Sequence, residues 1–472
     1  MRRLQHVIDG RAVASTDPET LPVVDPATEE VIAHIPVGSA EDVDAAVRSA
    51  VRAQPGWVAL DLAERIRLLE RVADAVEQNA ADLSRLENLE MGKPVPLAEQ
   101  FIAGGVAGWR QDLERAGSYP FVADVTVPGE PGRTIVERRP LGVVGVIIPW
   151  NFTVTSMLGA LVPLLASGNT VVLKPSEKSP LSAARFVELL GLPPGVVNLV
   201  HGDARAGRPL ASHEDVALLQ FTGSVEAGRS VGVAAAARLK RSVLELGGND
   251  PVIVDADVEV AATAGAVAFS SFVNSGQICT SSERIYVHRA VADEFVAALV
   301  AATEEYPLNT DRNGSGLGPL VDRAQRDLVH AHVTEAVALG ASVLRGGAIP
   351  DGPGFGYPAT VLTGLTPEMR VMREETFGPV APVVVVDSFD EAVEFANGTG
   401  FGLAATVYTR DLDHQRRAAD IRAALVWINA WQQGGVNATY EPWGLSGVGA
   451  GGADASFDAA TRPVSLLVAG TD

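Results

Sequence analysis

Short apolar runs alternate with helical stretches along most of this 472-residue chain, and that alternation limits the fold more than any other feature. Apolar runs typical of buried strands lie at residues 143–148, 170–173, 196–200, 216–221 and 242–246. Helical stretches lie between or after them, at residues 153–166, 179–190 and 226–238. The alternation predicts a parallel, doubly wound α/β sheet, a fold that commonly binds a nucleotide at the carboxyl ends of its strands.

Three other regions have patterns of their own. A second strand–helix series extends from about Pro251 to about Val426. A helical pattern begins at Asp61, which can serve as its N-cap, and ends near Met91. Residues 121–139 are typical of two strands joined by the turn residues Pro128-Gly129-Glu130-Pro131-Gly132. Because a two-stranded hairpin is marginal in water, we expect it to pair with something else, a second subunit being one option.

Composition narrows the classes of partner. With 37 basic and 58 acidic residues the formal charge is −21, and so acidic a surface repels nucleic-acid phosphates and anionic membrane lipid. The chain has one cysteine and so no internal disulfide, which fits a reducing cytoplasm. No apolar segment follows Arg2 and Arg3 to make a secretory signal. Pro149, Asn151 and Pro163 interrupt the uncharged stretch 141–173, so we expect strand, helix and strand there and no membrane span.

Two residues point to nucleophilic chemistry. A lone cysteine is more often an inert core residue, but small polar residues flank Cys279 in a way unlike a core strand. Its thiol could therefore approach a substrate, with backbone N–H groups nearby to stabilise charge. Upstream, Glu245 ends an apolar strand just before Gly247 and Gly248. A carboxyl group in an apolar setting has a raised pKa, which suits a general base near neutral pH.

Three further motifs follow predicted strands. Asn151, in Pro149-Trp150-Asn151-Phe152, can donate an amide N–H to a developing oxyanion or simply hold its own turn. Lys174-Pro175-Ser176-Glu177 lies where nucleotide-binding folds contact a ribose. Residues 221–228 combine a strand, a Gly-x-x-x-x-Gly turn and a helix start, with neither the Gly-x-Gly-x-x-Gly fingerprint nor a P-loop. Each motif alone is modest evidence.

In their order and spacing, these motifs make the sequence resemble the NAD(P)-dependent aldehyde dehydrogenase superfamily over nearly its whole length. The 34-residue interval from Glu245 to Cys279 and two later runs, at 374–379 and 397–403, belong to the same resemblance. It implies an α/β fold with two doubly wound parallel-sheet domains and a β-hairpin oligomerisation arm. The implied division is a dinucleotide-binding domain at 1–120 and 140–247, a catalytic domain at 248–445, and oligomerisation elements at 121–139 and 446–472.

The resemblance also implies a role for each matching residue. Cys279 matches the catalytic nucleophile, Glu245 the base that activates the deacylating water, and Asn151 the oxyanion-hole amide. The implied reaction oxidises an aldehyde to the carboxylic acid through a cysteine thiohemiacetal and a thioester, in a homodimer or homotetramer. The implied cofactor is NAD, with NADP as the alternative, and its contacts are Trp150, Lys174, Glu177, Gly223, Ser224, Gly228, Glu375 and Phe377. An acid such as Glu177 disfavours a 2′-phosphate, although Lys174 beside it could partly neutralise one.

The sequence departs from the family pattern at three places. Thr153 stands where a proline is usual, and Gly159 and Ala160 replace a bulky or charged residue and a lysine. The run 440–447 has lost a lysine and is shortened. These departures leave room for an alternative, a catalytically silent binding or structural subunit, although Cys279 and Glu245 are retained.

Other interpretations of the sequence have less support. A cysteine hydrolase would need a Cys–His pair, but the eight histidines lie in no recognisable hydrolase signature. No metal site is indicated, since His330 and His332 do not face one another on a helix, and we expect both on a solvated helix within 324–339. Apolar residues hint at an apolar or aromatic aldehyde, namely Phe152, Val154, Met157, Leu158 and Trp443.

Overall fold

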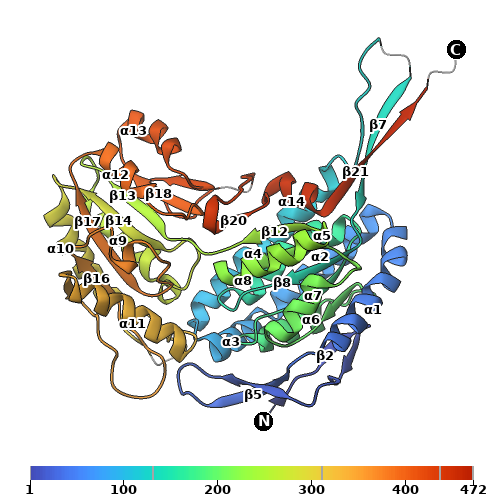
Figure 1. The fold of residues 1–472 in the computed structure, drawn as a ribbon, viewed down its shortest axis with the longest axis horizontal. Helices are drawn as coiled ribbons and strands as arrows, with labels where there is room; N and C mark the ends of the chain where they lie inside the picture. The colour runs from blue at the N-terminus through green and yellow to red at the C-terminus, as the bar shows by residue number, and fades with distance from the viewer. Residues whose placement is uncertain (1, 130–131, 310–311, 435–436, 470–472) are drawn as a thin grey trace.

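The computed structural model describes residues 2–129, 132–309, 312–434 and 437–469. Two sheet-containing lobes lie side by side, and a narrow arm projects from one of them, as Figure 1 shows. The chain forms all but one strand of the first lobe's sheet by Glu245 and begins the sheet of the second lobe at Asp250. Its last segment then returns to the first lobe and ends in the arm (Figure 1).

An eight-stranded sheet with the order β20-β12-β11-β8-β9-β10-β2-β3 forms the centre of the first lobe. The five predicted apolar runs are its five parallel strands, which confirms the parallel α/β expectation. Antiparallel strands close both edges. The strands are β2 (His6–Ile8), β3 (Arg11–Val13), β8 (Val143–Ile147), β9 (Thr170–Lys174), β10 (Val197–Leu199), β11 (Val216–Thr222), β12 (Arg241–Glu245) and β20 (Gly447–Val448).

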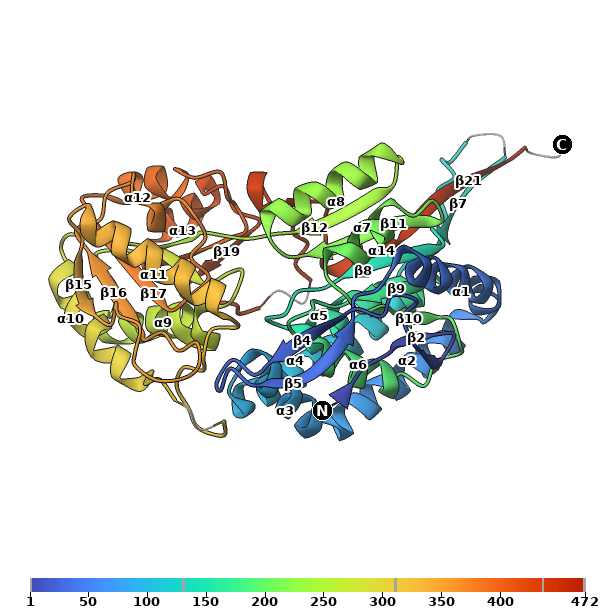
Figure 2. The ribbon, with the colours of Figure 1, turned by 60° about the horizontal axis from the view of Figure 1, so that its bottom comes forward.

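Helices cover both faces of this sheet because both faces are apolar. Buried side chains of α2, α4, α5 and α6 form one core, and those of α1, α7 and α8 form the other. Figure 2 shows α8 on one side of the sheet and α2, α4 and α6 on the other. The helices are α1 (Ala40–Ala59), α2 (Leu62–Gln78), α3 (Ala80–Met91), α4 (Val95–Ser118), α5 (Thr153–Ala166), α6 (Pro180–Leu189), α7 (Ala204–Ser212), α8 (Val225–Ala237) and α14 (Ala453–Ala460).

The predicted helix over 61–91 is two helices in the structure. Asp61 caps the first, accepting a hydrogen bond from the Glu64 backbone N–H at 2.7 Å, as expected. Asn79 then leaves helical geometry with φ −110° and ψ 13°, so it ends α2 and precedes α3. Apolar periodicity continues through the break, which is why sequence alone merges the two helices.

The second lobe holds a seven-stranded sheet with the order β15-β16-β17-β14-β13-β18-β19, parallel except for β15. Its strands are β13 (Asp250–Val254), β14 (Ser282–His288), β15 (Ser342–Arg345), β16 (Thr360–Thr363), β17 (Val380–Val386), β18 (Ala404–Tyr408) and β19 (Leu425–Ile428). Its helices are α9 (Val260–Phe272), α10 (Ala292–Ala302), α11 (Arg323–Ala338), α12 (Phe389–Ala396) and α13 (Leu412–Arg417). Apolar cores again lie on both faces.

The predicted hairpin is present, and its partner is the end of the same chain. Strands β6 (Val122–Asp124) and β7 (Arg133–Pro140) pair with each other, and β21 (Thr461–Val468) pairs with β7 along its whole length. Glu130 and Pro131, which the sequence places in the turn, lie outside the described residues. A second small sheet, β1-β5-β4, is made of β1 (Arg2–Arg3), β4 (Thr20–Val24) and β5 (Val31–Pro36).

The uncharged stretch 141–173 folds as β8, α5 and β9, which confirms the predicted strand, helix and strand. Within the described ranges, no helix is both long and apolar enough to cross a membrane.

The expectation of a solvated histidine pair on α11 is wrong for His332. That side chain is fully buried, with Nδ1 3.2 Å from Thr376 Oγ1, because this face of α11 packs against residues 374–376.

Candidate active site

Five of the predicted site residues lie at or just after the carboxyl ends of four strands in the first sheet. Asn151 follows β8, Gly223 and Ser224 follow β11, and Glu245 is the last residue of β12. Lys174 likewise ends β9. The chain passes from β8 to β9 in one direction and returns to place β11 on the other side of β8. Such a reversal opens a crevice where ligands bind in α/β sheets, and the predicted residues surround it.

Cys279 comes from the second lobe, on a strained turn between α9 and β14. Asn274 and Ser275 have φ of 53° and 57°, and Gly276 follows with 68°, so three successive residues are left-handed. Non-glycine residues in this region cost on the order of 1–3 kcal/mol each and need support. A Cβ on Gly276 would collide with the Gly378 carbonyl oxygen, so the turn packs directly on the neighbouring loop.

Hydrogen bonds supply that support. Ser275 Oγ donates to the Gly318 carbonyl oxygen at 2.8 Å, and Gln277 Oε1 accepts from the Val321 N–H at 2.9 Å. The Gln277 carbonyl oxygen accepts from Asn274 Nδ2 at 3.2 Å and from Asn151 Nδ2 at 3.0 Å. The turn that carries Cys279 is therefore tied to the loop of the first lobe that carries Asn151.

Asn151 is buried and keeps one amide hydrogen beyond the bond to Gln277. Gln277 lies two positions before Cys279, so the amide contacts the cysteine turn. This is the placement that the sequence predicted for an oxyanion donor.

The Cys279 thiol lies beside the Glu245 carboxyl group across the interface of the two lobes, close enough for each group to shift the pKa of the other. Burial raises the pKa of Glu245 to about 7, and the neighbouring Cys279 thiol opposes that rise. Burial also raises the pKa of the Cys279 thiol well above its usual range, and the Glu245 charge adds to the effect. Near neutral pH the pair therefore holds a thiol next to a carboxyl group that is about half ionised.

Glu375 and Phe377 lie on the next loop of the second lobe. Glu375 Oε1 accepts a hydrogen bond from the Gly248 N–H at 3.0 Å, and burial raises the pKa of Glu375. Phe377 has a φ of 49° and packs edge-on against Trp150, with ring centroids 5.5 Å apart. A half-buried carboxyl group and two aromatic rings thus meet between the lobes, near Glu245.

Lys174 and Glu177 lie at the end of β9, with Lys174 Nζ 4.0 Å from Glu177 Oε2. Lys174 is buried and also donates to the Pro175 carbonyl oxygen at 2.8 Å. Burial lowers the pKa of Lys174. Ammonium and carboxylate side by side can hydrogen-bond the vicinal hydroxyls of a ribose.

The β11–α8 turn offers the end of a helix to an anion. Ser224 is the N-cap of α8 and accepts from the Ala227 N–H at 3.3 Å. Gly228 packs so closely on Leu246 that a Cβ would collide with the leucine side chain. A helix N-terminus with free N–H groups suits a pyrophosphate. Together with Lys174 and Glu177, these groups fit a dinucleotide laid along the carboxyl edge.

Glu283, on β14, escaped the sequence reasoning. Its buried carboxyl group accepts from the Thr376 N–H at 2.9 Å, the Phe377 N–H at 2.7 Å and Asn249 Nδ2 at 3.1 Å. It therefore fixes the loop that carries Glu375 and Phe377. The available signal was an acid beside Arg284 at the start of an apolar strand, a position that reads equally well as a strand end.

Residues just before and within the shortened run 440–447 also contribute to the site. Trp431 Nε1 donates to the Thr280 carbonyl oxygen at 2.9 Å, and Gln432 Nε2 donates to Thr280 Oγ1 at 2.7 Å. Burial raises the pKa of the Tyr440 phenol, and the charges of Glu245 and Cys279 add to that rise. Trp431, Gln432 and Tyr440 were missed because the departing run 440–447 weakened every inference from this region.

The structure corrects the sequence-based hint about an apolar substrate. Val154, Met157 and Leu158 are completely buried in the core of the first lobe and line no open pocket. They face inward because α5 packs between the sheet and α4. By contrast, a Cβ on Gly159 would meet nothing within 4 Å, so this position faces open space.

Comparison with known proteins agrees with this geometry. Residues 12–465 match the family model described as "Aldehyde dehydrogenase family". A 3,6-anhydro-alpha-L-galactose dehydrogenase from Streptomyces coelicolor is 40% identical over 441 residues, which are 91% of this chain and 89% of that protein.

Solved structures of aldehyde dehydrogenases have the same fold as this chain. Lactaldehyde dehydrogenase from Escherichia coli superposes with a TM-score of 0.95 at 34% identity, covering 99% of each chain. Betaine aldehyde dehydrogenase from Staphylococcus aureus, in complex with NAD+, gives 0.94 at 28% identity, covering 98% of this chain and 94% of that one. The chain belongs to the aldehyde dehydrogenase family. It is an NAD(P)-dependent aldehyde dehydrogenase with the family's mixed α/β fold and antiparallel arm.

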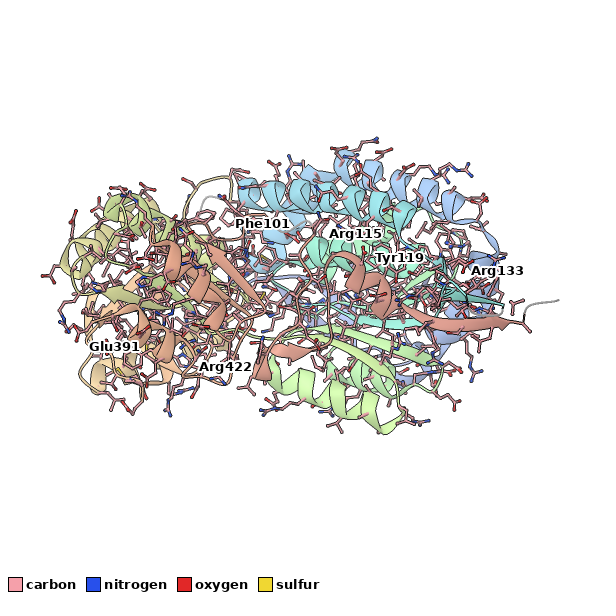
Figure 3. The ribbon with its side chains drawn as sticks, turned by 90° about the horizontal axis from the view of Figure 1, so that it is seen from above. Phe101, Arg115, Tyr119, Arg133, Glu391 and Arg422 are labelled. Carbon is pink, nitrogen blue, oxygen red and sulfur yellow. The ribbon has the colours of Figure 1, made fainter. Side chains whose placement is uncertain are left out.

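We expect Glu283→Gln to weaken NAD binding about 10-fold or more, because one backbone N–H of the 376–377 loop loses a charged acceptor. Quenching of tryptophan fluorescence by NAD measures the dissociation constant. Glu391→Gln is the matched control, since Glu391 lies at the outer end of the second lobe in Figure 3. An unchanged dissociation constant for Glu283→Gln would contradict the role of Glu283 in holding this loop.

Proposed function

We propose that this enzyme oxidises an aldehyde to the carboxylic acid by covalent catalysis at Cys279, with NAD as the hydride acceptor. The observation that carries the proposal is the meeting of three groups from two lobes. The Cys279 thiol lies beside the Glu245 carboxyl group, and the Asn151 amide bonds the carbonyl oxygen of Gln277, two positions before Cys279 in the same turn. A nucleophile, a base and an oxyanion donor are the parts that acyl chemistry on a carbonyl needs.

In the first half-reaction, Glu245 takes the proton of the Cys279 thiol as sulfur bonds to the aldehyde carbon. The carbonyl π electrons move to oxygen, where Asn151 Nδ2 and the Cys279 backbone N–H stabilise the negative charge. When bound, the nicotinamide supplies the acceptor for the hydride that leaves this carbon, so the aldehyde loses two electrons. The oxyanion lone pair re-forms the carbonyl, and Cys279 carries a thioester.

In the second half-reaction, Glu245 first releases its proton to solvent and then takes one from a water molecule. The water oxygen adds to the thioester carbon, with Asn151 again holding the oxyanion. The carbon–sulfur bond breaks, the acid leaves, and Cys279 regains its electron pair. A carboxyl group with a pKa of about 7 can both accept and release a proton at neutral pH.

The cofactor would bind in the first lobe, along residues 1–120 and 140–247, while residues 248–445 supply the nucleophile. Lys174 and Glu177 would hold the adenosine ribose, and the turn of Gly223, Ser224 and Gly228 the pyrophosphate. Glu375 would hold the nicotinamide ribose, with Phe377 and Trp150 beside the ring. Glu177 favours NAD, because its carboxylate repels the 2′-phosphate of NADP.

The arm supports a homodimer or homotetramer. Leu467 is 78% exposed and Val122 is 64% exposed, on the outer strands of the three-stranded arm. Figure 3 shows Arg133 of this arm at the end of the molecule, well outside both lobes. Exposed apolar residues on a projecting sheet favour a second copy as their cover. We also propose a cytoplasmic location, because a single cysteine suits a reducing compartment.

An assay at 340 nm tests the proposed reaction. With NAD and a panel that includes lactaldehyde, betaine aldehyde and aliphatic and aromatic aldehydes, we expect NADH formation that Cys279→Ala abolishes, and slower turnover with NADP. Glu245→Gln should form its first NADH more slowly and stall after one per active site, because both removal of the thiol proton and hydrolysis of the thioester lose their base. Continued turnover of Glu245→Gln at the wild-type rate would contradict its role. Cofactor binding with silence across the panel would favour the non-catalytic alternative.

The pH dependence follows from the raised pKa of Glu245. Burial disfavours its ionised form, so the base is active above pH 7 and is lost as the pH falls through about 7. We expect kcat/KM to fall about tenfold per pH unit below that point, since kcat/KM reports groups of the free enzyme. This decrease below pH 7 should be absent from the rate at which Glu245→Gln forms its first NADH. A profile that stays flat down to pH 5.5 would contradict the assignment.

The arm can be tested by a charge at its exposed apolar edge. We expect Leu467→Glu to weaken subunit association on the order of 100-fold, because a carboxylate would be buried in the contact. Light scattering coupled to size-exclusion chromatography measures the mass over a dilution series. Leu412→Glu, at a leucine that is 68% exposed on α13, is the control. An unaltered mass for Leu467→Glu at every dilution would argue against the arm contact.

A further inference from the structure

Helix α5 begins directly after Asn151, and its first turn has no cap from its own chain segment. The N-cap residue is Phe152, which has no side-chain acceptor and makes no capping hydrogen bond. The first backbone N–H groups of a helix need a partner, above all in a buried position. Whatever satisfies them also fixes the residues that lead into the helix.

A carboxyl group from another helix provides the partner. Glu87, on α3, is completely buried, and its Oε1 accepts from the Val154 N–H at 3.0 Å. Its Oε2 accepts from Lys93 Nζ at 2.8 Å, and the Lys93 side chain is also completely buried. Negative charge at a helix N-terminus is favourable, so Glu87 serves as a remote cap for α5.

Lys93 contacts Phe152, the N-cap residue of α5. Its Nζ lies 4.3 Å from the centroid of the Phe152 ring and 5.8 Å from that of Phe101, and the two rings pack edge-on at 4.8 Å. Figure 3 places Phe101 close to the junction of the two lobes. The ion pair thus touches Phe152 and Val154, the first and third residues after Asn151.

The residues around Lys93 also contact the second lobe, which carries Cys279. Gly92 has a φ of 83°, and a Cβ there would collide with Pro319. A Cβ on Gly318 would collide with the Gly92 carbonyl oxygen, so the two backbones are in direct contact. Gly318 is the residue whose carbonyl oxygen accepts from Ser275 in the cysteine turn. Residues 87–93 therefore bear on both the Asn151 loop and the Cys279 turn.

A buried ion pair is a poor source of stability, since desolvation of both charges offsets most of their attraction. Two apolar residues of similar size would remove both charges, and their main cost would be the Val154 N–H left without its acceptor. The pair does, however, specify a direction: one oxygen must face Lys93 and the other must face Val154. Its benefit is therefore geometric.

We propose that Glu87 and Lys93 are positioning residues that hold the Asn151 amide at the oxyanion site. This inference rests on the proposed role of Asn151. Neither side chain reaches the reacting atoms. Each acts by fixing the start of α5 against α3 and against the loop at Gly318.

A double-mutant cycle with Asn151 tests the coupling. We expect Glu87→Gln to lower kcat 10- to 100-fold, part of the loss expected for Asn151→Ala, with an unchanged dissociation constant for NAD. In the Asn151→Ala background the same substitution should lower kcat less than 2-fold, because no amide remains to be positioned. An equal loss in both backgrounds overturns the inference and leaves the proposed function intact. Wild-type kcat in Asn151→Ala overturns the proposed role of Asn151 and the inference with it.

A second variant separates positioning from stability. Glu87→Met combined with Lys93→Met replaces both charges, so the thermal midpoint should stay within a few degrees of the wild type while kcat remains lowered. Recovery of kcat together with the midpoint would overturn the inference. If Glu87→Gln does not fold, this pair replaces it in the cycle with the same criteria.

Glu90→Gln is the matched control. Glu90 is a buried acid on the same helix and accepts from Ser182 and Leu181 at the start of α6. It should leave kcat within 2-fold at saturating NAD. A loss as large as that of Glu87→Gln would show that any buried acid of α3 has this effect, and would overturn the assignment to Glu87.

Discussion

The hydrogen bond from Asn151 Nδ2 to the Gln277 carbonyl oxygen joins the two lobes at the proposed active site. Asn151 follows a strand of the first sheet, and Gln277 precedes Cys279 in the second lobe. The cysteine turn is left-handed at three successive residues and would relax without its ties. Hydrogen bonds through Asn274, Ser275 and Gln277 offset that strain and hold the turn that carries the proposed nucleophile. Strain at this turn is thus kept because the surrounding contacts over-determine it.

Buried carboxyl groups gather around this joint. Burial raises the pKa of Glu245, Asp250, Glu283 and Glu375, and repulsion from neighbouring carboxylates adds to the rise at Asp250 and Glu375. The cluster makes the site negative whenever these groups ionise, which opposes formation of the Cys279 thiolate. Binding of a cation beside it relieves that repulsion. Under the proposed binding of NAD, the positive ring of oxidised nicotinamide would be such a cation, and it would favour ionisation of the Cys279 thiol.

Strand–helix alternation was enough to predict the first sheet, because five short apolar runs between helical stretches are typical of buried parallel strands. The order of the motifs then identified the family. The break at Asn79 could not be read, since the apolar period continues across it. Nor could Glu283, Glu87 or Lys93 be found. Their importance comes from contacts with residues far away in the sequence, such as Val154 and Phe377, and no local pattern marks a charge as buried.

The departures from the family pattern act on separate parts of the site. At Thr153 the hydroxyl group contacts the Trp150 carbonyl oxygen at 3.3 Å and Ser179 Oγ at 2.5 Å, so hydrogen bonds constrain the position that a proline ring would otherwise constrain. Gly159 faces open space, so no side chain at this position limits the size of a molecule that approaches α5. Ala160 is buried, and it removes a side chain that could carry protons. Under the proposed mechanism Glu245 must then release its own proton between half-reactions, and a pKa of about 7 is the value that lets it do so.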